Sequence, residues 1–254
     1  MSKIFYIGFL VFLMSCSIKS GNSNEEATIN KVPHNISDDP CCSFNDLNTK
    51  IRDGKIKQDS AVILFKNLIP QIRSLYYSKG GTDFNSGFWI FPVQGYSESS
   101  IGGTNGSGYI ADHYNYFDGN KHKGHPAHDI FIFDRNQDCL DDRSGKQVNV
   151  LSISGGIVIA VENQWDTLSD LRGGKYIWIY EPISNSLFYY AHNSEIFVHL
   201  GDLVKPGDTI STVGRTGLNA HKKRSPTHLH LMQLGIDGNF CPIHINCYES
   251  LIKS

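Results

Sequence analysis

The sequence predicts a mainly β fold, in which an antiparallel sheet carries a small helical element on its N-terminal side. Short runs of β-branched and aromatic residues dominate the chain after residue 88, and glycine, proline, asparagine and aspartate separate them. The runs span residues 130–133, 148–153, 156–161, 175–180, 187–190, 209–213 and 228–234. Short strands between turn residues are typical of antiparallel sheets, and a chain of 254 residues can bury a core without disulfides.

Residues 40–86, before the strands, carry a helical pattern. Ser43 is a candidate helix N-cap, and Asp59 or Ser60 is a candidate start for a second helix whose apolar residues recur at helical spacing. Pro70 is expected to kink or break that helix, because proline lacks the amide hydrogen that a helix interior needs. We therefore expect a small helical element at 40–86 that packs on a second unit at 87–254.

Four side chains of the second unit have the types and spacing of metal ligands. His125 and Asp129 stand four residues apart, and His228 and His230 follow about a hundred residues later, two apart. On a β-strand both of these later histidines would leave the same face. Three such side chains are what a catalytic zinc ion takes from a protein, with its fourth position left open. The combination predicts a metal-dependent hydrolase.

A turn is needed between His125 and Asp129 if both are to bind one ion. An extended chain would hold them roughly 13 Å apart, whereas each ligand of a zinc ion lies about 2 Å from it. Pro126 fixes its own φ and favours an extended conformation for His125. We therefore expect a turn at 124–127, with Asp129 at the entrance of the strand that follows.

In this order, the residues resemble the lysostaphin-like or LytM-type zinc metallopeptidases, which cut peptidoglycan cross-bridges. The signature of that family is H-x-x-x-D, then a histidine in a Tyr-x-His context, then H-x-H. The chain carries these positions as His125 and Asp129, His192, and His228 and His230. Segments 201–208 and 213–217 are also similar, and the resemblance covers about residues 88–234. Segments 172–176 and 214–226 resemble a branch of the family from Bacteroidota-like bacteria.

The resemblance implies a fold, a chemistry and a role for each residue. The fold would be the twisted antiparallel sheet of the lysostaphin and LytM type, the duplicated hybrid motif. His125, Asp129 and His230 would hold Zn²⁺, while His192 and His228 would be catalytic, one accepting a proton from water and one stabilising the oxyanion. The implied activity is hydrolysis of peptidoglycan cross-links, and for a lipoprotein of a diderm bacterium we expect a D,D-endopeptidase.

Other polar residues near these positions have two interpretations each. Tyr190 is either a hydrogen-bond donor to the oxyanion or a core residue of its strand. Asn105 is either an inhibitory fourth metal ligand, as in latent relatives, or a loop residue. His128 should point away from Asp129, because neighbours on a strand leave opposite faces. The cations at 215 and 222–224 either attract substrate carboxylates or belong to a solvated loop.

Cysteine spacing and one acidic loop suggest further sites. Cys241 and Cys247 are candidates for a short disulfide, whereas adjacent Cys41 and Cys42 seldom pair with each other. Residues 134–138 alternate acidic and amide groups as calcium loops do. The sixth position is Cys139 instead of glycine, and no glutamate stands at the twelfth, so an ordinary polar hairpin loop is the favoured interpretation.

The N-terminus predicts export and lipid anchoring. A positive start at 1–3, an apolar run at 4–12 and a lipobox-like site at 13–16 resemble a bacterial lipoprotein signal, with 1–15 removed and Cys16 acylated. A plain secretory signal is the alternative. Residues 16–39 are polar and are expected to form a flexible tether. The expected location is the cell envelope, on a membrane anchor that faces the periplasm or the cell surface.

Charge excludes one class of partner and leaves three functional hypotheses. The formal net charge is −2 and no basic stripe carries interleaved aromatic residues, so nucleic acid is not an expected partner. The leading hypothesis is a zinc metalloendopeptidase that acts on the stem peptides of peptidoglycan. One alternative is a non-catalytic lipoprotein that binds peptidoglycan or activates an amidase, and another is a metalloprotease of proteins. The sequence leaves the oligomeric state open.

Overall fold

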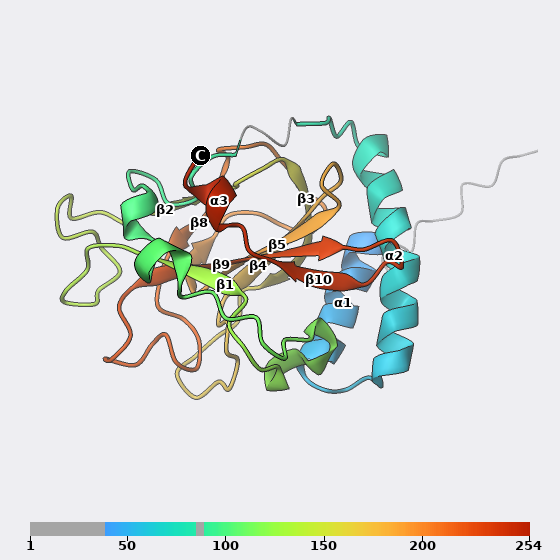
Figure 1. Ribbon diagram of the computed structural model, residues 1–254, viewed down its shortest axis with the longest axis horizontal. Helices are drawn as coiled ribbons and strands as arrows, with labels where there is room; N and C mark the ends of the chain where they lie inside the picture. The colour runs from blue at the N-terminus through green and yellow to red at the C-terminus, as the bar shows by residue number, and fades with distance from the viewer. Residues whose placement is uncertain (1–38, 85–88) are drawn as a thin grey trace, which may run out of the picture. The chain divides into compact units, whose positions relative to one another are not determined.

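The computed structural model describes residues 39–84 and 89–254, so the predicted signal peptide, Cys16 and nearly all of the tether lie outside the described residues. Within these ranges the strands form a seven-stranded sheet and a three-stranded sheet (Figure 1), and their pairs are antiparallel. The prediction of a mainly β fold with a small N-terminal helical element is confirmed. No helix in the described ranges combines the length and the apolar character needed to cross a bilayer.

The larger sheet has the strand order β1-β9-β5-β4-β3-β7, and β10 pairs with the second half of β9. Its strands are β1 (Ala127–Phe131), β3 (Gly156–Glu162), β4 (Tyr176–Glu181), β5 (Ser186–Ala191), β7 (Leu203–Val204), β9 (His228–Ile236) and β10 (Pro242–Ile245). The smaller sheet has the order β2-β8-β6. Its strands are β2 (Asn149–Leu151), β6 (Asn193–Ile196) and β8 (Thr209–Val213). The sequence did not predict β6, β7 and β10, because each is too short or too polar to show a strand pattern.

Hydrophobic clusters fill both faces of the larger sheet. Along β4, Tyr176 and Trp178 join the cluster on the helical side, while Ile177 and Ile179 join the cluster that includes residues of β2 and β8. This alternation is the period-two pattern of a strand that is buried on both faces. The larger sheet is therefore the middle layer, between the helices and the smaller sheet.

Helix α1 (Pro40–Arg52) begins earlier than the sequence predicted. Its N-cap is Asp39, whose carboxylate accepts hydrogen bonds from the amides of Cys41 at 2.7 Å and Cys42 at 3.2 Å. Pro40 suits the first helical position, because the amide there needs no partner within the helix. Ser43 lies inside the first turn, and its predicted capping role is wrong.

Helix α2 (Gln58–Ser78) continues through Pro70, so of the two predicted effects, a kink or a break, the break is wrong. Pro70 lies on the exposed side of the helix, where water can solvate the carbonyl that loses its helical partner. The opposite side buries Phe65, Ile69 and Ile72 in the helical cluster. This packing outweighs the penalty of about 3 kcal/mol that proline carries in a helix interior.

The 3₁₀ helix η4 (Tyr116–Lys121) lies tightly against α1 at Gly119. Gly119 has φ 54° and ψ −134°, a conformation that side-chain-bearing residues rarely adopt. A Cβ atom at this position would lie 2.1 Å from the carbonyl oxygen of Ile51 in α1. The contact between η4 and α1 therefore requires glycine. The remaining short elements are η2 (Glu98–Ser100), η3 (Thr104–Gly106) and α3 (Tyr248–Leu251).

We expect Gly119→Ala to lower the free energy of unfolding by about 2–4 kcal/mol, since it adds backbone strain and a backbone collision. Gly54→Ala is the control, because Gly54 also has a positive φ of 65° but a Cβ atom there would meet nothing within 4 Å. That variant should lose only about 1 kcal/mol. Denaturant unfolding measures both, and equal losses would show that the contact with α1 contributes nothing.

Candidate active site

The register of β1 and β9 places Asp129 directly opposite His230. Asp129 Oδ1 lies 3.0 Å from Nδ1 of His230 and 3.6 Å from Nε2 of His228, so both histidines face the same side of the sheet, as predicted. Asp129 is the third residue of β1, and its predicted place at the strand entrance is wrong by two residues. Met232 of β9 belongs to the helical cluster, so the site lies on the helical side of the larger sheet.

A turn at Pro126 brings His125 to the same carboxylate. The amide of Ala127 donates a hydrogen bond of 2.8 Å to the carbonyl of His125, which closes a three-residue turn within the predicted range. His125 Nε2 then lies 3.2 Å from Asp129 Oδ1. On the other side of the ring, Nδ1 is 3.0 Å from the carbonyl of Gly108. This contact assigns the hydrogen to Nδ1 and leaves the Nε2 lone pair facing Asp129.

The donor atoms of His125, Asp129 and His230 fit a zinc ion. One atom from each residue lies within 4.8 Å of the others. Ligands about 2.0–2.1 Å from a tetrahedral ion are separated by about 3.3 Å, and the His–Asp separations here are 3.2 Å and 3.0 Å. Two imidazole nitrogens and one carboxylate oxygen are a donor set that suits zinc.

Charge at this site also favours a cation. Burial opposes ionisation of Asp129, but the adjacent imidazoles of His125 and His230 hold the pKa of its carboxyl well below the usual value. Burial lowers the pKa of His230, and Asp129 offsets part of that effect. The carboxylate is therefore negative at neutral pH, next to imidazoles whose lone pairs can bind metal.

His192 joins this group from the bend between β5 and β6, where its backbone is left-handed with φ 67°. Its amide donates to the carbonyl of Gly173 at 2.9 Å, and its Nδ1 lies 2.7 Å from the carbonyl of Thr216. The ring centroid is 4.8 Å from that of His228 and 5.5 Å from that of His230. Positive φ at a non-glycine residue is strained and is often found at functional sites. No local sequence pattern predicts this conformation.

The protonation of His192 follows from its surroundings. Burial, together with the nearby His228 and His230, lowers the pKa of His192 well below its usual value. Since Nδ1 donates to Thr216, the neutral ring leaves the Nε2 lone pair free. His228 is fixed in a similar way, with Nδ1 2.7 Å from the carbonyl of Pro226. Both histidines are thus oriented by backbone carbonyls.

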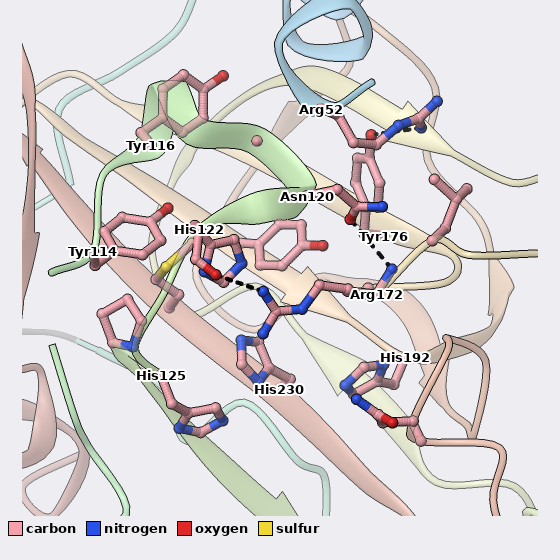
Figure 2. Close-up of a pocket in the computed structure, with 18 of the residues that line it drawn as sticks. Arg52, Tyr114, Tyr116, Asn120, His122, His125, Arg172, Tyr176, His192 and His230 are labelled. Carbon is pink, nitrogen blue, oxygen red and sulfur yellow. Dashed lines mark hydrogen bonds between the residues drawn. The ribbon is translucent and has the colours of Figure 1, made fainter. Parts of the chain in front are cut away.

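A cavity of about 290 Å³ extends from these histidines over the helical side of the sheet. Its lining includes Tyr176, Trp178 and Tyr189 from the sheet, and Asn48, Ile51 and Arg52 from α1. Figure 2 shows Arg52 and Tyr116 at the end of the cavity away from His125. The helical element therefore forms part of the cavity wall.

The tyrosine that faces the cavity is Tyr189. Of the two interpretations that the sequence left open for Tyr190, the structure supports the core residue. Tyr190 is fully buried on the other face of β5, where its hydroxyl accepts a hydrogen bond of 3.0 Å from the amide of Ile153. Tyr189 lines the cavity, with its ring centroid 6.1 Å from that of His230. The alternation of side chains along β5 was the signal that distinguishes the two residues.

Three other polar residues that the sequence offered as site candidates lie away from the candidate metal ligands. Asn105 is exposed and does not line the cavity, which favours the loop interpretation over the inhibitory one. His128 points to the opposite face, as predicted, with Nε2 2.9 Å from Asn246 Oδ1. Arg215 is buried and donates to the carbonyls of Ser225 at 2.6 Å and Lys222 at 3.0 Å. Its guanidinium stabilises the loop, and residues 222–224 do not line the cavity.

The loop at 134–138 is organised by protein hydrogen bonds. Buried Asp134 accepts from the amides of Asp138 at 3.0 Å and Cys139 at 2.9 Å, and from the Thr227 hydroxyl at 2.5 Å. These contacts occupy the carboxylate and agree with an ordinary hairpin loop instead of a calcium loop. They also attach the loop to the residue that precedes His228.

We expect Asp134→Ala to lower the free energy of unfolding by about 3 kcal/mol, because it removes the acceptor of three hydrogen bonds, two of them from backbone amides. Asp138→Ala is the control in the same loop, since that side chain is more exposed and should contribute less than about 1 kcal/mol. Thermal denaturation compares the two variants. Similar losses would contradict the structural role of Asp134.

Cysteines at 41, 42, 139, 241 and 247 are free thiols in the part of the chain that the structure describes. The predicted bridge between Cys241 and Cys247 is therefore wrong. Strand β10 lies between them, and four extended residues span roughly 13 Å. A disulfide requires Cα atoms less than about 7 Å apart. Cys247 is instead buried in the hydrophobic cluster on the side of the smaller sheet.

Comparison with known proteins gives a family match and several similar solved structures. The family model described as Peptidase family M23 matches residues 136–238. The catalytic domain of the antimicrobial peptidase lysostaphin from Staphylococcus simulans is 26% identical over 48% of this chain and 75% of its own, with a TM-score of 0.34. A candidate glycyl-glycine endopeptidase lytM from Ruminococcus gnavus is 26% identical over 65% of this chain and 60% of its own, with a TM-score of 0.42.

A third structure, a zinc containing peptidase from Vibrio cholerae, is 22% identical over 65% of this chain and 41% of its own, with a TM-score of 0.40. This chain thus spans less than two thirds of the length of the second and third structures. The family match includes His192, His228 and His230, and begins after His125 and Asp129, which the fold brings beside His230. The model of peptidase family M23 thus matches residues 136–238 of this chain.

Proposed function

We propose that this protein is a zinc-dependent endopeptidase that hydrolyses the peptide cross-links of peptidoglycan, and that it acts as a D,D-endopeptidase on the stem peptides. The observation that carries the proposal is the convergence of His125, Asp129 and His230, with His192 and His228 beside them. The match to a peptidase family supports the reaction type. The similar structure from Staphylococcus simulans is described as an antimicrobial peptidase.

Each residue has a chemical task in this proposal. Zinc, when bound by His125, Asp129 and His230, supplies a Lewis acid that polarises a carbonyl and makes water a stronger nucleophile at neutral pH. His192 is neutral and oriented by Thr216, so its Nε2 accepts a proton from the attacking water. His228 keeps a hydrogen on Nδ1 and, when protonated at Nε2, donates to the oxyanion that forms on the substrate.

Digestion of purified sacculi tests this function. With the zinc-loaded protein, we expect cross-linked dimers to become monomers, and mass spectrometry of the muropeptides identifies the bond that is cut. A chelator should abolish the conversion and added zinc should restore it. Intact dimers with a protein that holds zinc would overturn the endopeptidase assignment. Increased release of stem peptides by an added amidase would then support the activator alternative.

Lipid anchoring in the cell envelope is part of the same proposal, and the lipobox-like sequence ending at Cys16 supports it. The anchored protein would act on peptidoglycan from a membrane, facing the periplasm or the cell surface. Mass spectrometry of the mature N-terminal peptide should find Cys16 acylated as the first residue. A peptide that begins elsewhere or carries no acyl chain would favour the plain secretory signal.

A further inference from the structure

Arg172 places a positive charge in the cavity beside the candidate metal centre. It lies in the loop between β3 and β4 and lines the cavity, and Figure 2 shows its guanidinium between His122 and His230. Nη1 donates a hydrogen bond of 2.8 Å to the carbonyl of His122. The other guanidinium N–H groups have no protein acceptor among the described residues. An arginine that keeps free donors toward a cavity is available to a ligand.

No carboxylate neutralises Arg172 within the described ranges. The second arginine of the lining, Arg52, is paired with Asp53 and Glu162, each at 2.7 Å. The ion pairs of the described residues do not include Arg172. Asp129 is the single carboxylate among the described residues that line the cavity, and its Oδ1 lies against His125 at 3.2 Å and His230 at 3.0 Å instead of Arg172. Arg172 therefore has no ion-pair partner in the part of the chain that the structure describes.

Neighbouring groups around Arg172 are neutral hydrogen-bond donors or neutral rings. Burial and the charge of Arg172 lower the pKa of His122 to about 4, so this imidazole is uncharged at neutral pH. Burial raises the pKa of Tyr114 and Tyr189, so both phenols stay protonated. Neither hydroxyl has a hydrogen-bond partner in the part of the chain that the structure describes. These groups add donors and no competing anion.

The loop that carries Arg172 is fixed by two glycines. A Cβ atom on Gly173 would lie 1.9 Å from the Tyr189 hydroxyl, and Gly174 has φ 60° and packs on Thr216. The carbonyl of Gly173 also accepts a hydrogen bond from the amide of His192. The backbone next to Arg172 is thus attached to the same turn that positions the candidate general base. A rigid attachment lowers the entropy that arginine loses when it binds a ligand.

We propose that the cavity is a subsite for a free carboxylate on a residue that flanks the cleaved peptide bond, and that Arg172 binds this carboxylate. The assignment rests on the proposed endopeptidase function and names the chemistry of its substrate. A planar guanidinium with free N–H groups matches a carboxylate in a bidentate manner. The aromatic residues Tyr176 and Trp178 line the same cavity and contact the aliphatic part of the substrate.

Two synthetic cross-linked peptides that differ in one flanking group, free carboxylate or carboxamide, test this subsite. With the full-length zinc-loaded protein, we expect amidation to raise KM roughly 10- to 100-fold while kcat changes little. In Arg172→Gln, we expect the KM for the free-carboxylate peptide to rise by the same factor, and the KM for the carboxamide peptide to stay at its value in the parent protein. Arg172→Lys keeps the charge without the planar fork and should lose less. Arg135→Gln removes an exposed arginine outside the cavity and serves as the matched control.

Calorimetry with uncleavable analogues, in which the scissile amide is N-methylated, separates binding from catalysis. We expect the free acid to bind the parent protein roughly 10- to 100-fold more tightly than the amide, and this preference to disappear in Arg172→Gln. Equal affinities in the parent protein, or a preference that survives in Arg172→Gln, would overturn the subsite. A binding preference without cleavage of either peptide would overturn the endopeptidase function and leave the subsite standing.

Discussion

His230→Ala is expected to remove both zinc and peptidase activity. His230 lies opposite Asp129 in the β1 and β9 register and supplies one of the donor atoms that fit the ion. Loss of an outer partner of a metal ligand lowers metal affinity about 10- to 100-fold, and loss of the ligand itself should exceed that range. Dialysed protein should therefore contain little zinc by elemental analysis, and sacculus digestion should fall to the background of the assay.

The control for this prediction is His199→Ala, because the His199 side chain is 87% exposed and lies outside the site. That variant should keep one equivalent of zinc and full activity. His125→Ala and Asp129→Ala should behave as His230→Ala does, since each removes one donor of the same set. Zinc retained at parent affinity by any of these three variants would show that the residue is not a ligand.

His192→Asn is expected to lower kcat roughly 10²- to 10⁴-fold and to leave the zinc content unchanged, as loss of a general base does. Asparagine tolerates the left-handed backbone found at this position, so the substitution separates chemistry from strain. KM should change little, because His192 contacts water in the proposed mechanism and not the bound peptide. Initial rates over a range of substrate concentrations, with zinc measured on the same samples, give both quantities.

Two outcomes of the His192 experiment would contradict the assignment. Loss of zinc would make His192 a ligand, and a kcat within a few-fold of the parent would exclude it as the base. His199→Asn is the matched control for the introduced residue. His228→Ala should also lower kcat with zinc retained, because its Nε2 lies 3.6 Å from Asp129 Oδ1 without belonging to the donor set.

The site was predictable from sequence to the extent that it depends on spacing. The two-residue interval of His228 and His230 fixes a common face on a strand, and a turn at Pro126 is required to bring His125 to Asp129. The strand runs were also recognisable, because alternation and turn residues mark them. These features depend on residues that are close together in the sequence, so their spacing and type are enough to predict them.

Features that depend on contacts between distant segments were not predictable in this way. Pro70 stays within α2 because α1 and η4, with residues of the sheet, bury the opposite side of the helix. The left-handed conformation of His192 is held by Gly173 and Thr216, which are far from it in sequence. The choice of Tyr189 over Tyr190 needs the exact register of β5, and a shift of one residue reverses the two faces.

Helix α1 links the stability of the fold to substrate specificity, because it contributes residues to both the hydrophobic core and the cavity. Phe44 and Leu47 hold the helical cluster, while Asn48 and Arg52 of the same helix line the cavity. A substitution at Leu47 would therefore disturb substrate binding without touching a functional group, and a bound peptide would in turn stabilise the fold. The helical element therefore cannot be exchanged or lost from this domain without a change in the substrate that the cavity accepts.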